Sequence, residues 1–158
     1  MKQIPLTQGK FAIVDDADFD VLIPHKWHYT ANGYAGRNMV IDGKKTIVLM
    51  HKMLNETPLG HHTDHINGNR LDNRRSNLRT ATASQNLMNC AHRPHSSKYK
   101  GASWDKSRCK WEAHITINRK KQHLGRFESE EDAGNAYNAA ALKEFGAYAR
   151  LNNIQGVM

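Results

Sequence analysis

The sixteen residues from Asp64 to Arg79 constrain this chain more than any other stretch. They contain an adjacent Asp-His pair, four asparagines and four arginines. Such a segment is too polar to serve as a core element, because buried polar groups need partners. It is also richer in metal-ligand and phosphate-binding groups than an ordinary loop. We therefore expect the rest of the chain to supply a scaffold for this stretch and to bring it to a target.

The bulk composition predicts a modest core and an anionic partner. The chain has 158 residues, enough for one ordinary domain or two small ones, and 39% of them are hydrophobic. Its net charge of +8 points towards nucleic acid or an anionic surface. No apolar run approaches the roughly 18 residues that span a bilayer, and the first residues do not read as a secretory leader. Cys90 and Cys109 lack a CxxC partner, which suits a reducing cytosol.

The positive charge lies in two blocks. Residues 61–98 hold six Lys and Arg against two Asp and Glu, and residues 99–127 hold eight against two. Residues 1–60 are nearly balanced, with seven against six, and residues 128–158 are acidic, with two against five. This distribution predicts a polyanion that contacts the chain in two places.

Residues 1–60 are typical of a small β-rich scaffold. An apolar strand is expected at residues 11–14, followed by an acidic turn at Asp15-Asp16. Two hairpins are predicted around Asn32-Gly33 and Asp42-Gly43, because each dipeptide lies between apolar runs. A short helix is expected at residues 50–54.

Three ring side chains of this scaffold have two interpretations each. Trp27 and Tyr34 are interpreted as core residues, with base stacking as the functional alternative. His51 is interpreted as a buried, hydrogen-bonded histidine, with a supporting position near a site as the alternative.

Residues 61–89 predict a strand, a long polar loop, a second strand and a short helix for which Ser84 is the expected N-cap. This order would place Asp64, His65 and Asn86 around one small volume. Residues 90–98 have no periodicity and are expected to form a basic linker.

Residues 99–158 predict a second compact unit. Strands are expected at 101–104, 110–117 and 122–127, and Ser129 and Gly146 bound a helix that begins with acidic residues. The middle strand alternates apolar and polar residues, so one face should pack on the helix. The predicted fold class is therefore α+β: a β-rich region, the central polar motif, and a three-stranded antiparallel sheet packed on one α-helix. The basic face of that sheet is the predicted nucleic-acid surface.

The central stretch suits metal-assisted hydrolysis. The carboxylate of Asp64 and the amide of Asn86 are hard oxygen ligands, and two of them leave most of an Mg²⁺ shell to water and phosphate. A neutral imidazole at His65 can take a proton from water near pH 7. On a strand, His65 should project to the side opposite Asp64. The alternative is a plain turn, since Asn, Asp and Gly are the residues that turns use.

The pattern Asp64-His65-x-Asn-Gly-Asn-x-x-Asp-Asn-x-x-Ser-Asn-Leu-Arg, followed by Ser84-Gln85-Asn86, closely resembles the HNH nuclease motif. It is most similar to HNH homing endonucleases of phages and mobile introns, over roughly residues 45–90. The resemblance implies a ββα-metal motif over about residues 61–89. In that motif Asp64 and Asn86 bind one divalent metal, His65 is the general base and Asn77 holds the His65 loop. Asn86 stands where many relatives have His, which favours Mg²⁺ or Mn²⁺ over zinc. The surplus arginines are interpreted as phosphate contacts, with plain solvation as the alternative: Arg70, Arg74, Arg75 and Arg79.

Residues 99–152 resemble the Apetala-two/ethylene-response-factor DNA-binding domain. The resemblance rests on Tyr99-Lys100-Gly101, Lys110-Trp111-x-Ala113-x-Ile115, Leu124-Gly125-x-Phe127, the Glu-Glu-Asp-Ala helix start, Ala136-Tyr137, Ala140-Ala141 and Leu151-Asn152. That family lays its sheet in the major groove, as a β-ribbon can. Carried over by strand position, the DNA-facing candidates are Lys100, Ser103, Trp104, Lys106, Arg108, His114, Thr116, Arg119 and Lys121.

These observations predict a metal-dependent endonuclease acting at selected sites in double-stranded DNA. Its expected organisation is an HNH domain at 1–89, a linker at 90–98 and a DNA-reading domain at 99–158. We expect a monomer or weak dimer in the cytoplasm of a bacterial host, encoded by a phage or mobile element, with no membrane contact. The alternatives are a DNA-binding regulator with an inactive HNH motif, a relatively non-specific nuclease and an RNA-directed module.

Overall fold

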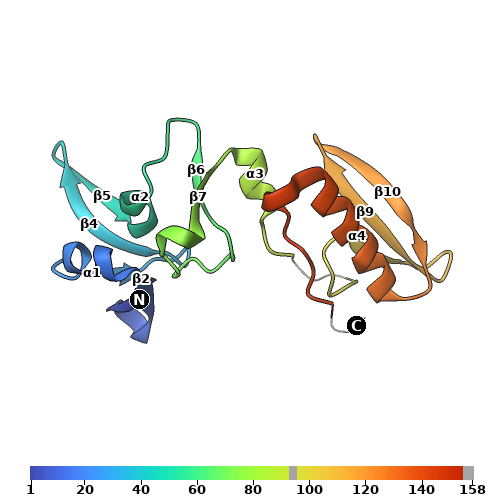
Figure 1. Cartoon of the computed structure of the whole chain (residues 1–158), viewed down its shortest axis with the longest axis horizontal. Helices are drawn as coiled ribbons and strands as arrows, with labels where there is room; N and C mark the ends of the chain where they lie inside the picture. Colours follow the sequence, from blue (N-terminus) through green and yellow to red (C-terminus); the bar gives the residue numbers. More distant parts are fainter. Residues whose placement is uncertain (93–95, 155–158) are drawn as a thin grey trace. The chain divides into compact units, whose positions relative to one another are not determined.

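The chain forms two compact units, Met1–Asn86 and Leu87–Met158. The computed structural model describes residues 1–92 and 96–154, and Figure 1 follows them from the N-terminus to the C-terminus. The boundary falls inside a short helix, three residues before the expected end of the first domain. The predicted linker 90–98 includes residues 93–95, which lie outside the described residues. Within the described residues, no helix is both long enough and apolar enough to cross a membrane.

The N-terminal unit contains three small antiparallel sheets and several short helices. Its elements, in chain order, are β1 (Lys2–Pro5), η1 (Thr7–Gly9), β2 (Phe11–Val14), α1 (Asp16–Leu22), β3 (His28–Tyr29), β4 (Ala35–Ile41), β5 (Lys44–Leu49), α2 (Met50–Leu54), β6 (His62–His65), η2 (Arg75–Asn77), β7 (Leu78–Ala81) and α3 (Ala83–Met88).

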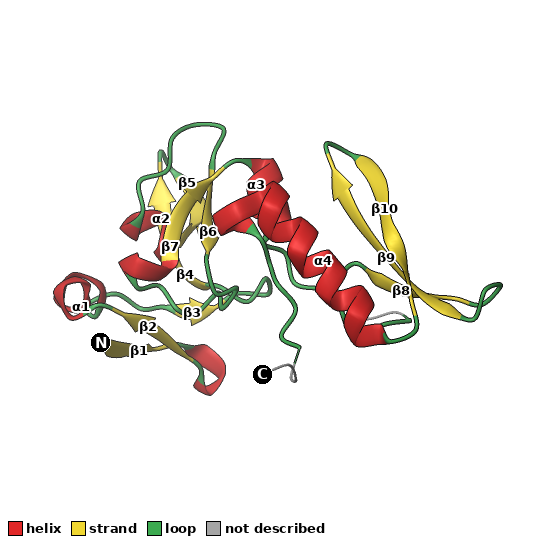
Figure 2. Cartoon of the chain, turned by 45° about the vertical axis from the view of Figure 1, so that its right-hand side comes forward, coloured by secondary structure: helices red, strands yellow, loops and turns green. Residues whose placement is uncertain are grey.

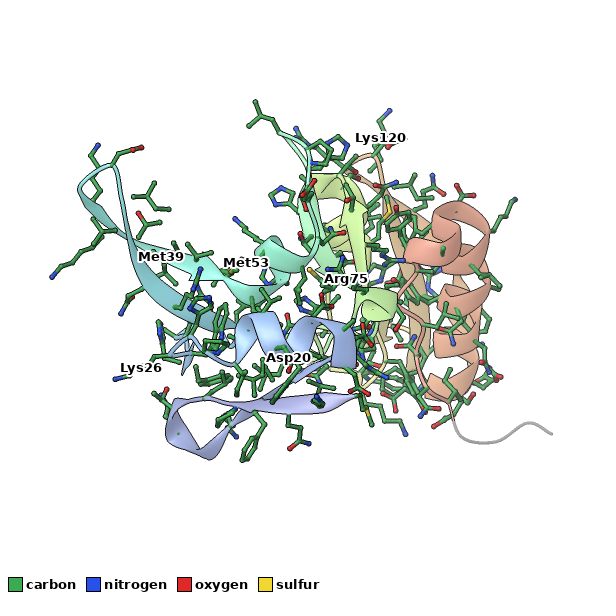
Figure 3. All side chains as sticks on the ribbon, turned by 60° about the vertical axis from the view of Figure 1, so that its left-hand side comes forward. Asp20, Lys26, Met39, Met53, Arg75 and Lys120 are labelled. Atoms are coloured by element: carbon green, nitrogen blue, oxygen red, sulfur yellow. The ribbon has the colours of Figure 1, made fainter. Side chains whose placement is uncertain are left out.

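Both predicted hairpins are present in the β3-β4-β5 sheet. Asp42 and Gly43 both have positive φ values, 50° and 75°, as a two-residue hairpin turn requires. Strands β4 and β5 continue as a ribbon beyond the rest of the unit, with Met39 along it (Figure 3). Val40 and Ile47 on this ribbon are 67% and 53% exposed, so its outer part contributes nothing to the core.

One buried apolar cluster joins these sheets. Trp27 is 5% exposed, and its indole N–H donates to the carbonyl of Leu22 at 2.8 Å. The interpretation of Trp27 as a core residue is therefore confirmed. The other buried members of the cluster come from six different elements or their flanks: Ile4, Leu6, Ala12, Val14, Leu22, Ala35, Met50, Leu54 and Leu78.

Two local predictions for this unit were wrong. The acidic turn expected at Asp15-Asp16 is the start of α1, which runs for seven residues. The N-cap of α3 is Thr82 and not Ser84. The backbone N–H of Gln85 donates to the hydroxyl of Thr82 at 3.2 Å, and the backbone N–H of Thr82 donates to the side-chain oxygen of Gln85 at 2.9 Å. This reciprocal pair is a capping box.

The C-terminal unit is a three-stranded antiparallel sheet, in the order β10-β9-β8, with one long helix across a face (Figure 2). Its elements are β8 (Ala102–Asp105), β9 (Lys110–Ile117), β10 (Lys120–Phe127), α4 (Glu130–Phe145) and η3 (Gly146–Tyr148). As predicted, Ser129 caps α4 by accepting from the backbone N–H of Asp132 at 3.0 Å. Ala113 and Ile115 of β9 are buried with Tyr137 of α4 and the small residues around it. The mixed α+β class is therefore confirmed.

Candidate active site

The loop between β6 and β7 is held by its own polar side chains. The side-chain oxygen of Asn77 accepts from the backbone N–H of Asn67 at 3.0 Å, and its amide nitrogen donates to the side-chain oxygen of Asn67 at 3.0 Å and to the carbonyl of Asp72 at 2.8 Å. The backbone N–H of Ile66 donates to the carbonyl of Asn77 at 2.9 Å. Asn77 thus fixes the backbone that follows His65.

Strand β2 secures the same loop from the side. The N–H of Ile13 donates to the carbonyl of Leu71, and the N–H of Asn73 donates to the carbonyl of Ile13, both at 2.8 Å. Asp72 and Asn73 are 2% and 0% exposed. The loop is therefore part of the folded core of the unit, although its sequence is polar.

His65 ends β6 and is 5% exposed. Its Nε2 lies 3.3 Å from the side-chain oxygen of Asn73, whose amide nitrogen donates to the carbonyl of Leu71 at 3.2 Å. An amide oxygen can only accept, so the proton of a neutral His65 ring belongs on Nε2 and the basic nitrogen is Nδ1. Burial lowers the pKa of His65, although the hydrogen bond that its Nε2 donates to Asn73 acts in the opposite direction. The side chain that contacts this imidazole is Asn73, to which the sequence analysis assigned no role.

Two further aromatic rings surround His65. The His51 ring lies edge-on to it with centroids 5.1 Å apart, and the Tyr34 ring lies 5.9 Å from His65 and 4.9 Å from His51. His51 is 4% exposed, and its Nδ1 is buried without a hydrogen-bond partner among the described residues. Burial, reinforced by the nearby His65 and Lys52, lowers the pKa of His51 to about 3. Both imidazoles are therefore uncharged near pH 7.

Asp64 lies on the opposite side of β6 from His65 and is 6% exposed. It is directly across from Arg79 in the β6–β7 register. One carboxylate oxygen accepts from Nε of Arg79 at 2.8 Å and from Nη2 at 2.7 Å. The guanidinium predicted to contact phosphate therefore neutralises the carboxylate predicted to bind metal.

The other three arginines of the stretch also have partners within the chain. Arg74 is paired with Asp72 at 2.6 Å, and Arg75 with Asp18 of α1 at 2.7 Å. Arg70 donates to the carbonyl of Asn32 at 2.6 Å and lies over a tyrosine ring at 4.8 Å. The sequence analysis predicted that these side chains contact phosphate or solvent. In the structure all four also contact other groups of the chain.

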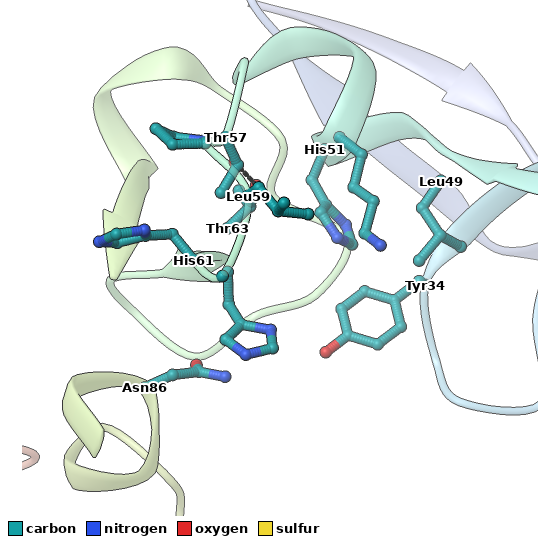
Figure 4. Close-up of a pocket in the computed structure, with 12 residues that line it drawn as sticks. Tyr34, Leu49, His51, Thr57, Leu59, His61, Thr63 and Asn86 are labelled. Carbon is teal, nitrogen blue, oxygen red and sulfur yellow. Dashed lines mark hydrogen bonds between the residues drawn. The ribbon is translucent and has the colours of Figure 1, made fainter. Parts of the chain in front are cut away.

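A cavity of about 490 Å³ lies beside these rings (Figure 4). Tyr34 and His51, which flank His65, form part of its wall, and so does Thr63 of β6. Asn86 of α3 also lines the cavity, whereas Asp64 does not belong to its described wall. The remaining wall comes from the end of β5, from α2 and from the loop that leads to β6: Leu49, Lys52, Thr57, Pro58, Leu59, Gly60, His61 and His62.

No three His, Cys, Asp or Glu side chains gather closely enough to hold a metal ion anywhere in residues 1–92 or 96–154. A metal held by Asp64 and Asn86 would therefore have one carboxylate and one amide oxygen from the protein. This donor set fits a hard cation that keeps several water ligands.

In the C-terminal unit, the register assigns the predicted DNA-facing strand residues to two different faces. Ser103 pairs with Glu112, Lys121 with Thr116, and His123 with His114, all on the face that α4 does not cover. Four of the predicted DNA-facing residues therefore lie on this open face: Ser103, His114, Thr116 and Lys121. Three more predicted residues are exposed in the turns at its ends: Lys106, Arg108 and Arg119.

Two residues of the predicted DNA-facing set do not lie on the open face of the sheet. Trp104 pairs with Trp111, which packs against the core under α4, and the two rings lie 5.1 Å apart. Lys100 donates its ammonium to the carbonyls of Met88 and Cys90 at 2.7 and 2.9 Å, and burial lowers its pKa. The missed residues of the open face are Lys110, His123 and Arg126, which strand alternation could have identified.

Comparison with known proteins gives three results. A family model described as HNH endonuclease matches residues 53–88. The chain is 30% identical over 152 residues to an uncharacterized HNH endonuclease of Acanthamoeba polyphaga mimivirus, covering 93% of this chain and 77% of that protein. It is 36% identical over 68 residues to protein 3.8 of Escherichia phage T7, covering 42% of this chain and 56% of that protein. No solved structure matches.

Proposed function

Because the chain belongs to the HNH endonuclease family, we propose that it hydrolyses phosphodiester bonds at selected sites in double-stranded DNA, with the help of one divalent metal. The expected products carry 5′-phosphate and 3′-hydroxyl ends. The viral relatives support an origin in a phage or another mobile element.

The observation that carries this proposal is the environment of His65. Its ring is buried, its pKa is lowered, and its Nε2 faces an amide oxygen, so Nδ1 is the nitrogen that can accept a proton. In the proposed reaction Nδ1 takes the proton of the attacking water near neutral pH. Asn73 orients the ring, and Asn77 holds the backbone behind it.

Asp64 and Asn86 would hold the metal, which is Mg²⁺ or Mn²⁺ in this proposal. When bound, it would stabilise negative charge on the scissile phosphate and the leaving oxygen. Arg79 pairs with the carboxylate of Asp64 and fixes its orientation. Asn86 is carried by α3, whose capping box defines where the helix begins.

The open face of the β8-β9-β10 sheet would read the DNA, as in the Apetala-two-like domain that residues 99–152 resemble. Helix α4 covers the opposite face and begins with three acidic residues, which disfavours DNA on that side. Basic residues of the open face and its turns would give affinity, and a few groove contacts would add selectivity. A polar sheet face with Lys121 and Arg126 exposed supports this assignment.

The test is plasmid cleavage by the full chain, with Mg²⁺ and then with EDTA. His65→Ala should lower the cleavage rate by about 100-fold or more, because a general base contributes that much. His25→Ala removes an exposed histidine of the same unit and should cut as the parent does. Cutting in EDTA, or full activity of His65→Ala, would overturn the mechanism.

A DNA-binding regulator with an inactive HNH motif is the second candidate. The ion pair between Asp64 and Arg79 favours it, since that contact competes with a metal for the carboxylate. Such a regulator would shift a labelled duplex in a gel and leave supercoiled plasmid intact with both Mg²⁺ and Mn²⁺.

A further inference from the structure

The cavity beside His65 is lined by hydrogen-bond donors and contains no carboxylate in its described wall. Lys52, His61, His62 and the hydroxyl-bearing Tyr34 belong to this wall. Figure 4 shows the Tyr34 hydroxyl directed into the cavity, between His51 and Asn86. A wall of this composition favours an anion over a cation.

These donors are not used by the fold. Within the described part of the chain, the side chains of Lys52, His61 and His62 have no ion pair and no hydrogen bond. The arginines of the central stretch are the opposite case, because Arg74, Arg75 and Arg79 each pair with a carboxylate. The donors on the cavity wall are therefore more available to an external phosphate than Arg74, Arg75 and Arg79.

The backbone around the cavity is well tied. The N–H of His61 donates to the carbonyl of Pro58 at 3.0 Å, which closes a tight turn through Gly60 at φ 82°. The hydroxyls of Thr57 and Thr63 are 2.6 Å apart, so the loop before β6 is fastened to the strand that carries His65. His61 and His62 are thus carried by a backbone segment with its own hydrogen bonds.

We infer that Lys52, His61 and His62 form a phosphate clamp that holds a nucleotide of the cleaved strand next to His65. This inference rests on the proposed function, since the cleaved strand is the ligand. A cavity of about 490 Å³ is within the range of small-molecule sites, roughly 300–1,000 Å³, and accepts one sugar-phosphate unit with water. The clamp would supply phosphate contacts of the kind that the sequence analysis predicted for the arginines of the central stretch.

The binding test uses the full chain in EDTA, with thymidine 5′-monophosphate as the probe and histidine ring signals followed by NMR. The signals of His61 and His62 should shift and that of His25, elsewhere in the unit, should not. Lys52→Ala should weaken binding about tenfold or more, the effect of one lost hydrogen bond to an anion. The matched control Lys10→Ala removes another exposed lysine of the unit and should bind as the parent does. The proposal is wrong if the signals of His61 and His62 do not shift, or if Lys52→Ala binds the nucleotide as tightly as the parent protein.

The cleavage test uses plasmid and Mg²⁺ at several salt concentrations. Lys52→Ala should raise KM with little change in kcat and reduce the salt dependence of DNA affinity by about one phosphate contact. If the nucleotide binds while KM and salt dependence stay unchanged, the cavity takes only free phosphate monoesters and the clamp is wrong. If the parent protein does not cut DNA at all, the proposed function is wrong. The NMR shifts and the salt dependence of DNA binding then still test whether the clamp binds phosphate.

Discussion

Acidification should destabilise the N-terminal unit through His51. The pKa of this buried imidazole is lowered from 6.5 to about 3, first by burial and then by His65 and Lys52. As the pH falls below 6.5, His51 becomes protonated in the unfolded chain. In the folded chain it stays neutral down to about pH 3. Stability is therefore fully present above pH 6.5 and is lost as the pH falls through this window, at up to about 1.4 kcal/mol per pH unit. Between pH 7 and pH 5 the loss amounts to about 2 kcal/mol.

Urea unfolding followed by tryptophan fluorescence measures this loss. Only three tryptophans are present, so Trp104→Phe with Trp111→Phe leaves Trp27 as a reporter in the core of the N-terminal unit. In that background His51→Phe keeps an aromatic ring against its neighbours and removes the titrating group. It should lose about 2 kcal/mol less than its parent between pH 7 and pH 5.

The control is His25→Phe, which replaces an exposed histidine of the same unit and should leave the pH dependence unchanged. Equal losses for His51→Phe and its parent would refute burial of His51 as the source of acid sensitivity. The same comparison at pH 8 and pH 7 should give nearly identical unfolding free energies, because both pH values lie above the window.

Three further substitutions test other contacts. Arg79→Leu removes the guanidinium that pairs with the buried carboxylate of Asp64, and urea unfolding should show a loss of about 3 kcal/mol. Gly101→Ala places a methyl group against the ring of Tyr137, the core tyrosine of α4, and should lower the stability in thermal unfolding by more than about 3 kcal/mol. Its control, Gly43→Ala, has a similar φ but open space around it and should lower the stability by about 1 kcal/mol. Thr82→Ala removes the capping box of α3 and should cost about 1 kcal/mol, with faster amide exchange in that helix, whereas Ser84→Ala should change neither quantity.

Elements specified by local chemistry were predicted well. Asp42-Gly43 adopts the backbone that only such a pair reaches easily, and Ser129 satisfies the first turn of α4 with its own hydroxyl. Helix α1 was missed for the opposite reason. Its acidic residues resemble a turn signal, but Asp18 pairs with Arg75, which is 57 residues away. Nothing within a short window of sequence contains that information.

The candidate site divides in the same way. The spacing of the motif predicted which residues carry the chemistry, because the motif is a local pattern of Asp, His and Asn. It did not predict which groups would face them. Asn73 and His51 approach His65 from outside β6, and Arg75 and Arg79 meet carboxylates that the fold brings opposite them. The sequence shows that an arginine is present, but only the tertiary structure shows whether a carboxylate already neutralises its charge.

The hydrogen bonds of Lys100 bear on residues 90–98, which the sequence predicted to be a basic linker. As a flexible linker, residues 90–98 would have nine residues of contour length. In the structure, however, the ammonium of Lys100 donates to the carbonyls of Met88 and Cys90. The ring of His92 also donates to the carbonyl of Ser97 at 3.0 Å. The two ends of the segment are therefore joined. Glycine-serine residues inserted there would enlarge a closed loop, at a cost that grows only with the logarithm of its length, and would not lengthen a tether. The covalent joint between the units is helix α3 itself, which carries Asn86.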